Sequence, residues 1–153
     1  MKGYDDLLRF LRELDGSLEK LTTLQEEKRA AVQDVDSLNE CMKREQAISL
    51  ALRGLEGKRL KLMSELGLEG VPLRDLPGRC PPEHRTETSQ AVEQVLRSYQ
   101  VLQSAQKAAR TVLEGRLHHV EAELKRRGLD PEETASAVHV SRDREHVHTD
   151  FKA

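Results

Sequence analysis

The side chains with the most metal-binding chemistry to offer are the six histidines of this 153-residue chain. His118 and His119 are adjacent, so on a helix they point to different faces. No Glu-x-x-His precedes either of them, and HExxH is absent. His139 and the pair in His146–His148 could collect zinc or nickel, but we favour their interpretation as incidental members of a mobile tail. We therefore expect no metal site.

Nucleophilic and phosphate-binding motifs are also absent from the sequence. Cys41 and Cys80 form no CxxC pair and have no convincing histidine partner, which favours reduced, structural thiols. The stretch "DVDSLNE" resembles the start of a calcium loop, but Leu38 occupies its fifth position and the sixth lacks glycine. GxSxG, the Walker loop and GxGxxG do not occur. The sequence therefore predicts a protein that is not an enzyme and uses no cofactor.

Composition points to long helices instead. Charged residues make up 34% of the chain and aromatic residues 3%, and Leu, Ala, Glu, Lys, Arg and Gln dominate. The formal net charge of -2 provides no large field for nucleic acid. No apolar run approaches the roughly 18 residues that span a membrane. Asp5 and Asp6 argue against a signal peptide. We expect a soluble, cytoplasmic protein that binds no nucleic acid and does not insert into membranes.

Two helical seams cover the segment from Tyr4 to Leu66. The first advances in steps of three and four, as expected of a helix packed on another helix: Leu7, Leu11, Leu14, Leu18, Leu21. The second resumes after a phase shift near Asp34–Glu40: Met42, Ile48, Leu52, Leu55, Leu62, Leu66.

The phase shift has two interpretations. Ser37 and Glu40 have the spacing of a capping box, with Asp36 and Asn39 as alternative caps, so the chain can turn there. One continuous helix with a stutter remains open. A single helix of about 60 residues would reach ~90 Å, which no later helix matches, so we favour a break. Gly54 and Gly57 suggest the close approach of another helix.

A proline-containing linker follows, at about residues 67–84. Gly67 suits a left-handed helix cap, and Leu68 suits the apolar contact of a Schellman motif. Leu73 and Leu76 are expected to attach the linker to the end of the bundle.

The last long helix begins between Pro82 and Ser89 and ends at Gly128. Lys125, Arg126 and Arg127 fit the cationic last turn of a helix better than a nucleic-acid footprint. The helix carries a third seam: Val92, Val95, Tyr99, Leu102, Ala109, Leu113, Leu117, Val120, Leu124.

These elements predict an all-α fold, an antiparallel bundle or hairpin of three long helices with coiled-coil-like packing. Residues 1–128 form the helical domain, and residues 129–153 form a short helix, at about 131–138, or a flexible tail. Most of the leucines must pack against each other. The seam that outlasts its partner is the candidate binding surface, made of these residues: Leu113, Leu117, Val120, Leu124, Leu129, Val138, Val140.

The run from Glu26 to Leu68, "EEKRAAVQDVDSLNECMKREQAISLALRGLEGKRLKLMSELGL", resembles the first half of FlgN-like flagellar export chaperones. That family has a lysine-bearing helix, an Asp-x-x-x-Leu-like step, a glutamate or lysine, and a Leu-Glu-x-x-Arg run that ends in Leu-Gly. The matching positions are Lys28, Asp36, Glu45, Leu55, Glu56, Arg59, Leu66 and Gly67.

The resemblance implies a cytoplasmic, non-catalytic chaperone that works without ATP. Such chaperones hold the helical terminal segments of hook-associated proteins in solution and deliver them to the flagellar type III export apparatus. The last helix is then the expected contact. The alternative function is a structural coiled-coil adaptor that self-associates without a client, and a homodimer is compatible with both.

Overall fold

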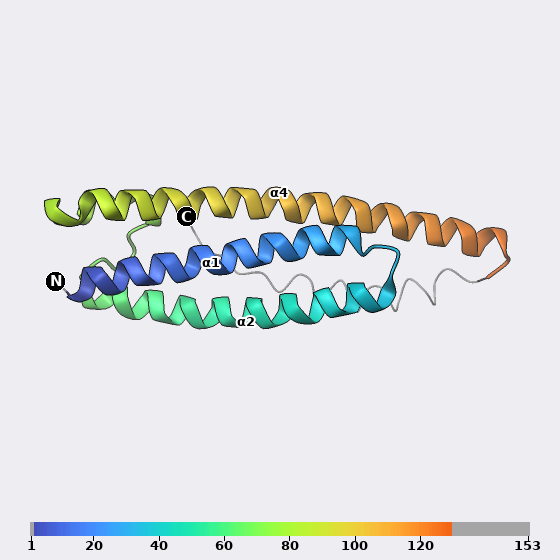
Figure 1. Cartoon of the computed structure of the whole chain (residues 1–153), viewed down its shortest axis with the longest axis horizontal. Helices are drawn as coiled ribbons and strands as arrows, with labels where there is room; N and C mark the ends of the chain where they lie inside the picture. Colours follow the sequence, from blue (N-terminus) through green and yellow to red (C-terminus); the bar gives the residue numbers. More distant parts are fainter. Residues whose placement is uncertain (1, 130–153) are drawn as a thin grey trace.

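The computed structural model describes residues 2–129, and this part of the chain is helical with short connections and contains no strand (Figure 1). The expectation of an all-α fold is confirmed for these residues. Three long helices are joined by a tight turn and by a longer connection that holds a 3₁₀ turn, η1, and one short helix. The elements are α1 (Lys2–Ala30), α2 (Val35–Glu65), η1 (Leu73–Asp75), α3 (Leu76–Arg79) and α4 (Pro82–Arg126).

The three long helices run up, down and up. α2 returns along α1, and α4 then runs in the same direction as α1 (Figure 1). α1 packs against both of the other long helices. Its parallel register with α4 is marked at two points. The ring of Tyr4 stacks on His84 with centroids 5.0 Å apart, and farther along the hydroxyl of Ser98 donates to the carboxylate of Asp15.

The leucine seam of α1 forms the centre of the core. Leucines at steps of three and four residues fall on one stripe of a helix, and α1 buries that stripe between its two neighbours. Full burial of a leucine side chain contributes roughly 1.5–3 kcal/mol. The seam residues Leu7, Leu11, Leu14 and Leu18 are almost completely buried.

The predicted break between the first two helices exists, but it lies earlier than the capping-box position. α1 ends at Ala30, and Asp34 is the N-cap of α2. Its carboxylate accepts hydrogen bonds from the backbone N–H groups of Asp36 and Ser37, at 3.1 and 3.3 Å. Ser37 is therefore not the cap, because its hydroxyl donates to Asp34 instead, at 2.7 Å.

The end of α2 is a Schellman motif, as predicted. Gly67 has φ 69°; its N–H donates to the carbonyl of Ser64, and the N–H of Leu68 donates to the carbonyl of Met63 at 2.8 Å. Leu68 is buried, which supplies the apolar contact of the motif.

The connection to α4 is packed onto the core by leucines. Leu73 and Leu76 are both buried members of the central cluster, as expected. α4 begins at Pro82, where a proline loses no helical hydrogen bond because the first N–H groups of a helix have no intrahelical acceptor. Arg85 stabilises the connection by donating to the carbonyl of Pro77 at 3.2 Å.

Two glycines of α2 are a correction to the sequence analysis. A Cβ atom added at Gly54 or at Gly57 would meet nothing within 4 Å. No helix in the described part of the chain approaches them, because both lie on the side of α2 that faces away from α1.

Candidate functional site

The longest helix continues beyond the body of the molecule. α4 has 45 residues, whereas α1 has 29 and α2 has 31. α1 and α4 begin, and α2 ends, near the same end of the molecule. The last turns of α4 therefore extend past the turn between α1 and α2 at the other end (Figure 1).

The register between α1 and α4 shows where α1 stops covering α4. Asp15 contacts Ser98, and α1 ends fifteen residues beyond Asp15, at Ala30. Because α1 and α4 run parallel, the residue of α4 that lies level with the end of α1 is fifteen positions beyond Ser98, at Leu113. We therefore call residues 113–126 the overhang of α4.

The apolar seam of α4 does not stop where α1 stops. Val92, Val95, Leu102 and Ala109 are buried beside α1. The same spacing then continues through four residues that are only half-buried. We call them the overhang stripe: Leu113, Leu117, Val120 and Leu124. The structure thus places four of the seven predicted binding residues together on one face of α4.

The remaining predicted binding residues do not join that stripe in the described structure. Leu129 follows the last turn of α4 and is 55% exposed. Val138 and Val140 lie outside the described residues, as do the expected helix at 131–138 and the histidines from His139 onward. Their contribution stays a prediction.

The end of the overhang is capped like the end of α2. Gly128 has φ 74°. Its N–H donates to the carbonyl of Lys125, and the N–H of Leu129 donates to the carbonyl of Leu124, at 3.1 and 2.9 Å. Arg126 and Arg127 both pair with Glu123. Two of the three basic residues are thus held by ion pairs within the last turns, and the interpretation of the triplet as a cap of the helix dipole stays a prediction.

The polar groups around the overhang stripe form no constellation for bond-making chemistry. His118 lies 4.0 Å from Glu121, one turn along the same helix, and its side chain is largely exposed. Over residues 2–129, no three His, Cys, Asp or Glu side chains gather as metal ligands. What the overhang offers is a half-covered apolar stripe three turns long. That surface is suited to packing against another helix.

Sequence reasoning missed a second exposed apolar feature, on α2. Leu50 is 68% exposed and Leu60 is 65% exposed, on the side of the helix opposite α1. The available signal was their spacing, because neither leucine belongs to the seam that runs from Met42 to Leu66.

No helix within residues 2–129 is long and apolar enough to span a membrane. Residues 1–126 match the sequence model of the family described as FlgN protein. The chain belongs to the FlgN family. No curated protein and no solved structure matches the chain significantly.

The residues that carry the FlgN resemblance have visible structural roles. Lys28 on α1 pairs with Glu45 on α2 at 2.9 Å, inside the interface of the hairpin. Arg59 pairs with Glu56 at 3.8 Å along α2. Leu66 and Gly67 form the cap described above. Of these FlgN-type positions, Lys28 and Glu45 join α1 to α2, whereas Glu56, Arg59, Leu66 and Gly67 act within α2 or at its end. The candidate binding surface lies on α4.

Proposed function

We propose that this FlgN family member is a cytoplasmic, non-catalytic export chaperone. It binds the helical terminal segments of hook-associated proteins on the overhang of α4 and delivers them to the flagellar type III export apparatus. The observation that carries the proposal is the overhang stripe, a helix-packing seam that continues after its partner helix α1 has ended. Membership of the FlgN family supports this choice of client class.

The geometry suits a client helix that lies in line with α1. Such a helix would pack on the same face of α4 that α1 uses, with leucine-sized side chains at steps of three and four residues. Its contact length is limited to about 18 Å, the length of twelve helical residues. Completing the burial of four half-buried side chains would contribute roughly 3–6 kcal/mol before the costs of association. Such a contact is reversible, as delivery requires.

The rival function is an adaptor that self-associates through the same stripe and has no client. The two functions differ in stoichiometry. A chaperone forms a defined complex with the terminal segment of a hook-associated protein, and an adaptor forms a concentration-dependent oligomer of its own chain.

The first test places a charge in the overhang stripe. We expect Leu117→Glu to weaken binding of a co-expressed hook-associated protein by at least about tenfold, because it puts a carboxylate into the apolar contact. Val101→Glu is the matched control, since Val101 is exposed on α4 away from the stripe. Affinity is measured by isothermal titration calorimetry, and helix content by circular dichroism.

Two results would contradict the proposal. One is equal binding by Leu117→Glu and Val101→Glu, and the other is self-association without any complex in light scattering.

In the same calorimetric assay, deletion of residues 129–153 tests Leu129, Val138 and Val140. We expect a loss of a few-fold, and unchanged affinity would remove these three from the contact.

A further inference from the structure

The outward side of α2 carries an apolar centre that nothing in the described structure covers. It is defined by the exposed residues between 43 and 61 that point away from α1. We call this surface the outer face of α2. Its members are Lys43, Gln46, Ala47, Leu50, Ala51, Arg53, Gly54, Gly57, Leu60 and Lys61.

Small residues leave the backbone of α2 accessible between the two exposed leucines. Leu50, Gly54 and Gly57 follow each other at steps of four and three, so they lie on one line along the helix. Leu60 follows one turn after Gly57. Since nothing lies within 4 Å of a Cβ at either glycine, another backbone can approach closely there. On this line no side chain stands between Leu50 and Leu60, and we call this open stretch of helix the recess.

The charged residues of the outer face all have one sign. They are lysines and arginines, in a chain whose formal net charge is -2. The two acidic residues of the stretch do not belong to this face, because Glu45 pairs with Lys28 of α1 and Glu56, whose side chain is 40% exposed, pairs with Arg59.

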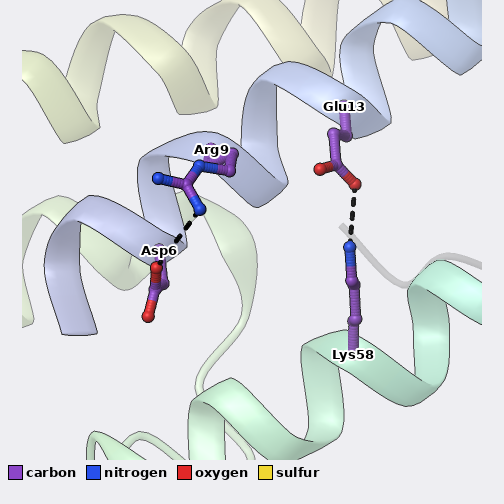
Figure 2. A network of polar contacts seen from close by, with 4 residues as sticks. All are labelled: Asp6, Arg9, Glu13 and Lys58. Atoms are coloured by element: carbon purple, nitrogen blue, oxygen red, sulfur yellow. Dashed lines mark hydrogen bonds and ion pairs between the residues drawn. The ribbon is translucent and has the colours of Figure 1, made fainter. Parts of the chain in front are cut away.

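Two basic residues of the stretch reach back to α1. Arg44 pairs with Glu27, and Lys58 pairs with Glu13 at 3.2 Å, as Figure 2 shows.

The three basic side chains of the outer face, Lys43, Arg53 and Lys61, have no ion-pair partner among the described residues. They flank the leucines and glycines on the outer face. By contrast, Arg9 on α1 lies 3.8 Å from Asp6 of its own helix (Figure 2). Positive charge on the outer face of α2 is therefore uncompensated, and it selects a partner of opposite sign.

We propose that the outer face of α2 is a docking surface for an acidic amphipathic helix of a partner protein, separate from the overhang of α4. A leucine-sized side chain of the partner enters between Leu50 and Leu60 over Gly57. Carboxylates that flank it pair with Lys43, Arg53 and Lys61. A second copy of this chain is a poor occupant, because α2 against α2 would bring these basic side chains together.

The probe for this surface is a 21-residue helical peptide with leucine at heptad positions a and d and glutamate at e and g. It is titrated into the ¹⁵N-labelled full-length protein while backbone amide shifts are recorded. We expect the largest shifts at residues 47–61. A matched peptide with lysine at e and g should cause no such shifts, and raising the salt concentration should weaken binding of the acidic peptide.

Two variants test the recess and the charge. Gly57→Leu fills the recess and Arg53→Glu reverses one charge, and each should weaken the acidic peptide by about tenfold. The matched controls are Gly16→Leu on α1, where an added Cβ meets nothing within 4 Å, and Lys107→Glu, an exposed position on α4. Both lie outside the two proposed surfaces and should leave the affinity unchanged.

Three outcomes would overturn the proposal. The first is that the amide shifts are confined to residues 113–126, and the second is that the acidic and basic peptides bind equally well. The third is that the acidic peptide causes no shifts, whereas the protein binds phosphatidylglycerol vesicles and Arg53→Glu abolishes that binding. None of these outcomes bears on the client contact of the overhang, because Leu117→Glu tests that contact separately.

Discussion

Asp34 caps the start of α2, directly after the hairpin turn. Its carboxylate binds two backbone N–H groups at the start of α2 and the hydroxyl of Ser37. The hydrogen bond from the Ser37 hydroxyl, followed by the bond from the Ser37 backbone N–H, lowers the pKa of Asp34 below its ordinary value of 3.8. A carboxylate with a lowered pKa stabilises the folded state above its unfolded pKa and loses that contribution as the pH falls through the folded value.

The prediction from this cap concerns how the free energy of unfolding changes at acid pH. Asp34→Asn keeps a good cap but removes the titrating group. We expect the variant to lose less stability than the unchanged protein as the pH falls below about 4. Asp34→Ala should be less stable than both near neutral pH. Urea unfolding followed by circular dichroism between pH 2 and pH 7 measures this. Parallel profiles for Asp34→Asn and the unchanged protein would contradict the assignment.

Sequence reasoning found the turn but not its cap. Asp34, Asp36 and Ser37 stand within four residues, and aspartate and serine cap helices about equally well. The choice depends on where α1 ends. That position is set by packing along α1 and cannot be read from the capping residues themselves.

The interface between α1 and α2 changes character along its length. Near the start of α1 it is made of leucine, but toward the turn it buries Gln25, Lys28 and Cys41. Lys28, whose side chain is 4% exposed, pairs there with Glu45. This polar portion explains why the leucine seam loses its phase near the turn. The helix still packs at those positions, but its buried side chains are no longer apolar.

The prediction for this interface concerns the Lys28–Glu45 ion pair. It compares the stability lost when one partner is removed with the stability lost when both are replaced. Lys28→Ala should destabilise the protein by about 3–5 kcal/mol, because it removes the partner of a mostly buried carboxylate. Replacing both partners, with Lys28→Met and Glu45→Leu, should restore most of that loss. Urea unfolding measures both changes. A double variant as unstable as Lys28→Ala would show that the packing, and not the unpaired charge, causes the loss.

Periodicity predicted the three long helices because their buried stripes repeat in steps of three and four. It did not predict the exposure of Leu50 and Leu60. Their spacing sets both leucines outside the seam, but a single leucine outside a seam does not indicate whether another element of the fold covers it.

The two ends of the described structure differ in how well the helices are packed. The central cluster combines residues of α1, α2, the connection and α4, and its last member on α4 is Leu102. One further residue of α4, Ala109, is buried beside α1, and beyond Ala109 the described part of α4 has no buried residue. The sequence showed how far the seam of α4 continues but not where its partner ends, since that depends on the register between α1 and α4.

Amide hydrogen exchange should reveal this gradient. We expect residues 113–126 to exchange much faster than residues 92–109 of the same helix, because a helix without tertiary contacts is only marginally stable. Exchange followed by mass spectrometry on the full-length protein measures both segments. Equal protection along α4 would contradict the overhang, and selective protection of 113–126 by a client would support the proposed contact.

The parallel pairing of α1 with α4 also affects how the protein is made. α1 is synthesised first, yet the residues of α4 that cover it, from Val92 to Leu102, come some eighty positions later. At ordinary translation rates of about 5–20 residues per second, that delay is roughly 4–16 s. Throughout it, the nascent α1–α2 hairpin presents a leucine face that its own chain cannot yet cover. A protein proposed to shield the helices of others thus has an unshielded helix of its own during every round of synthesis.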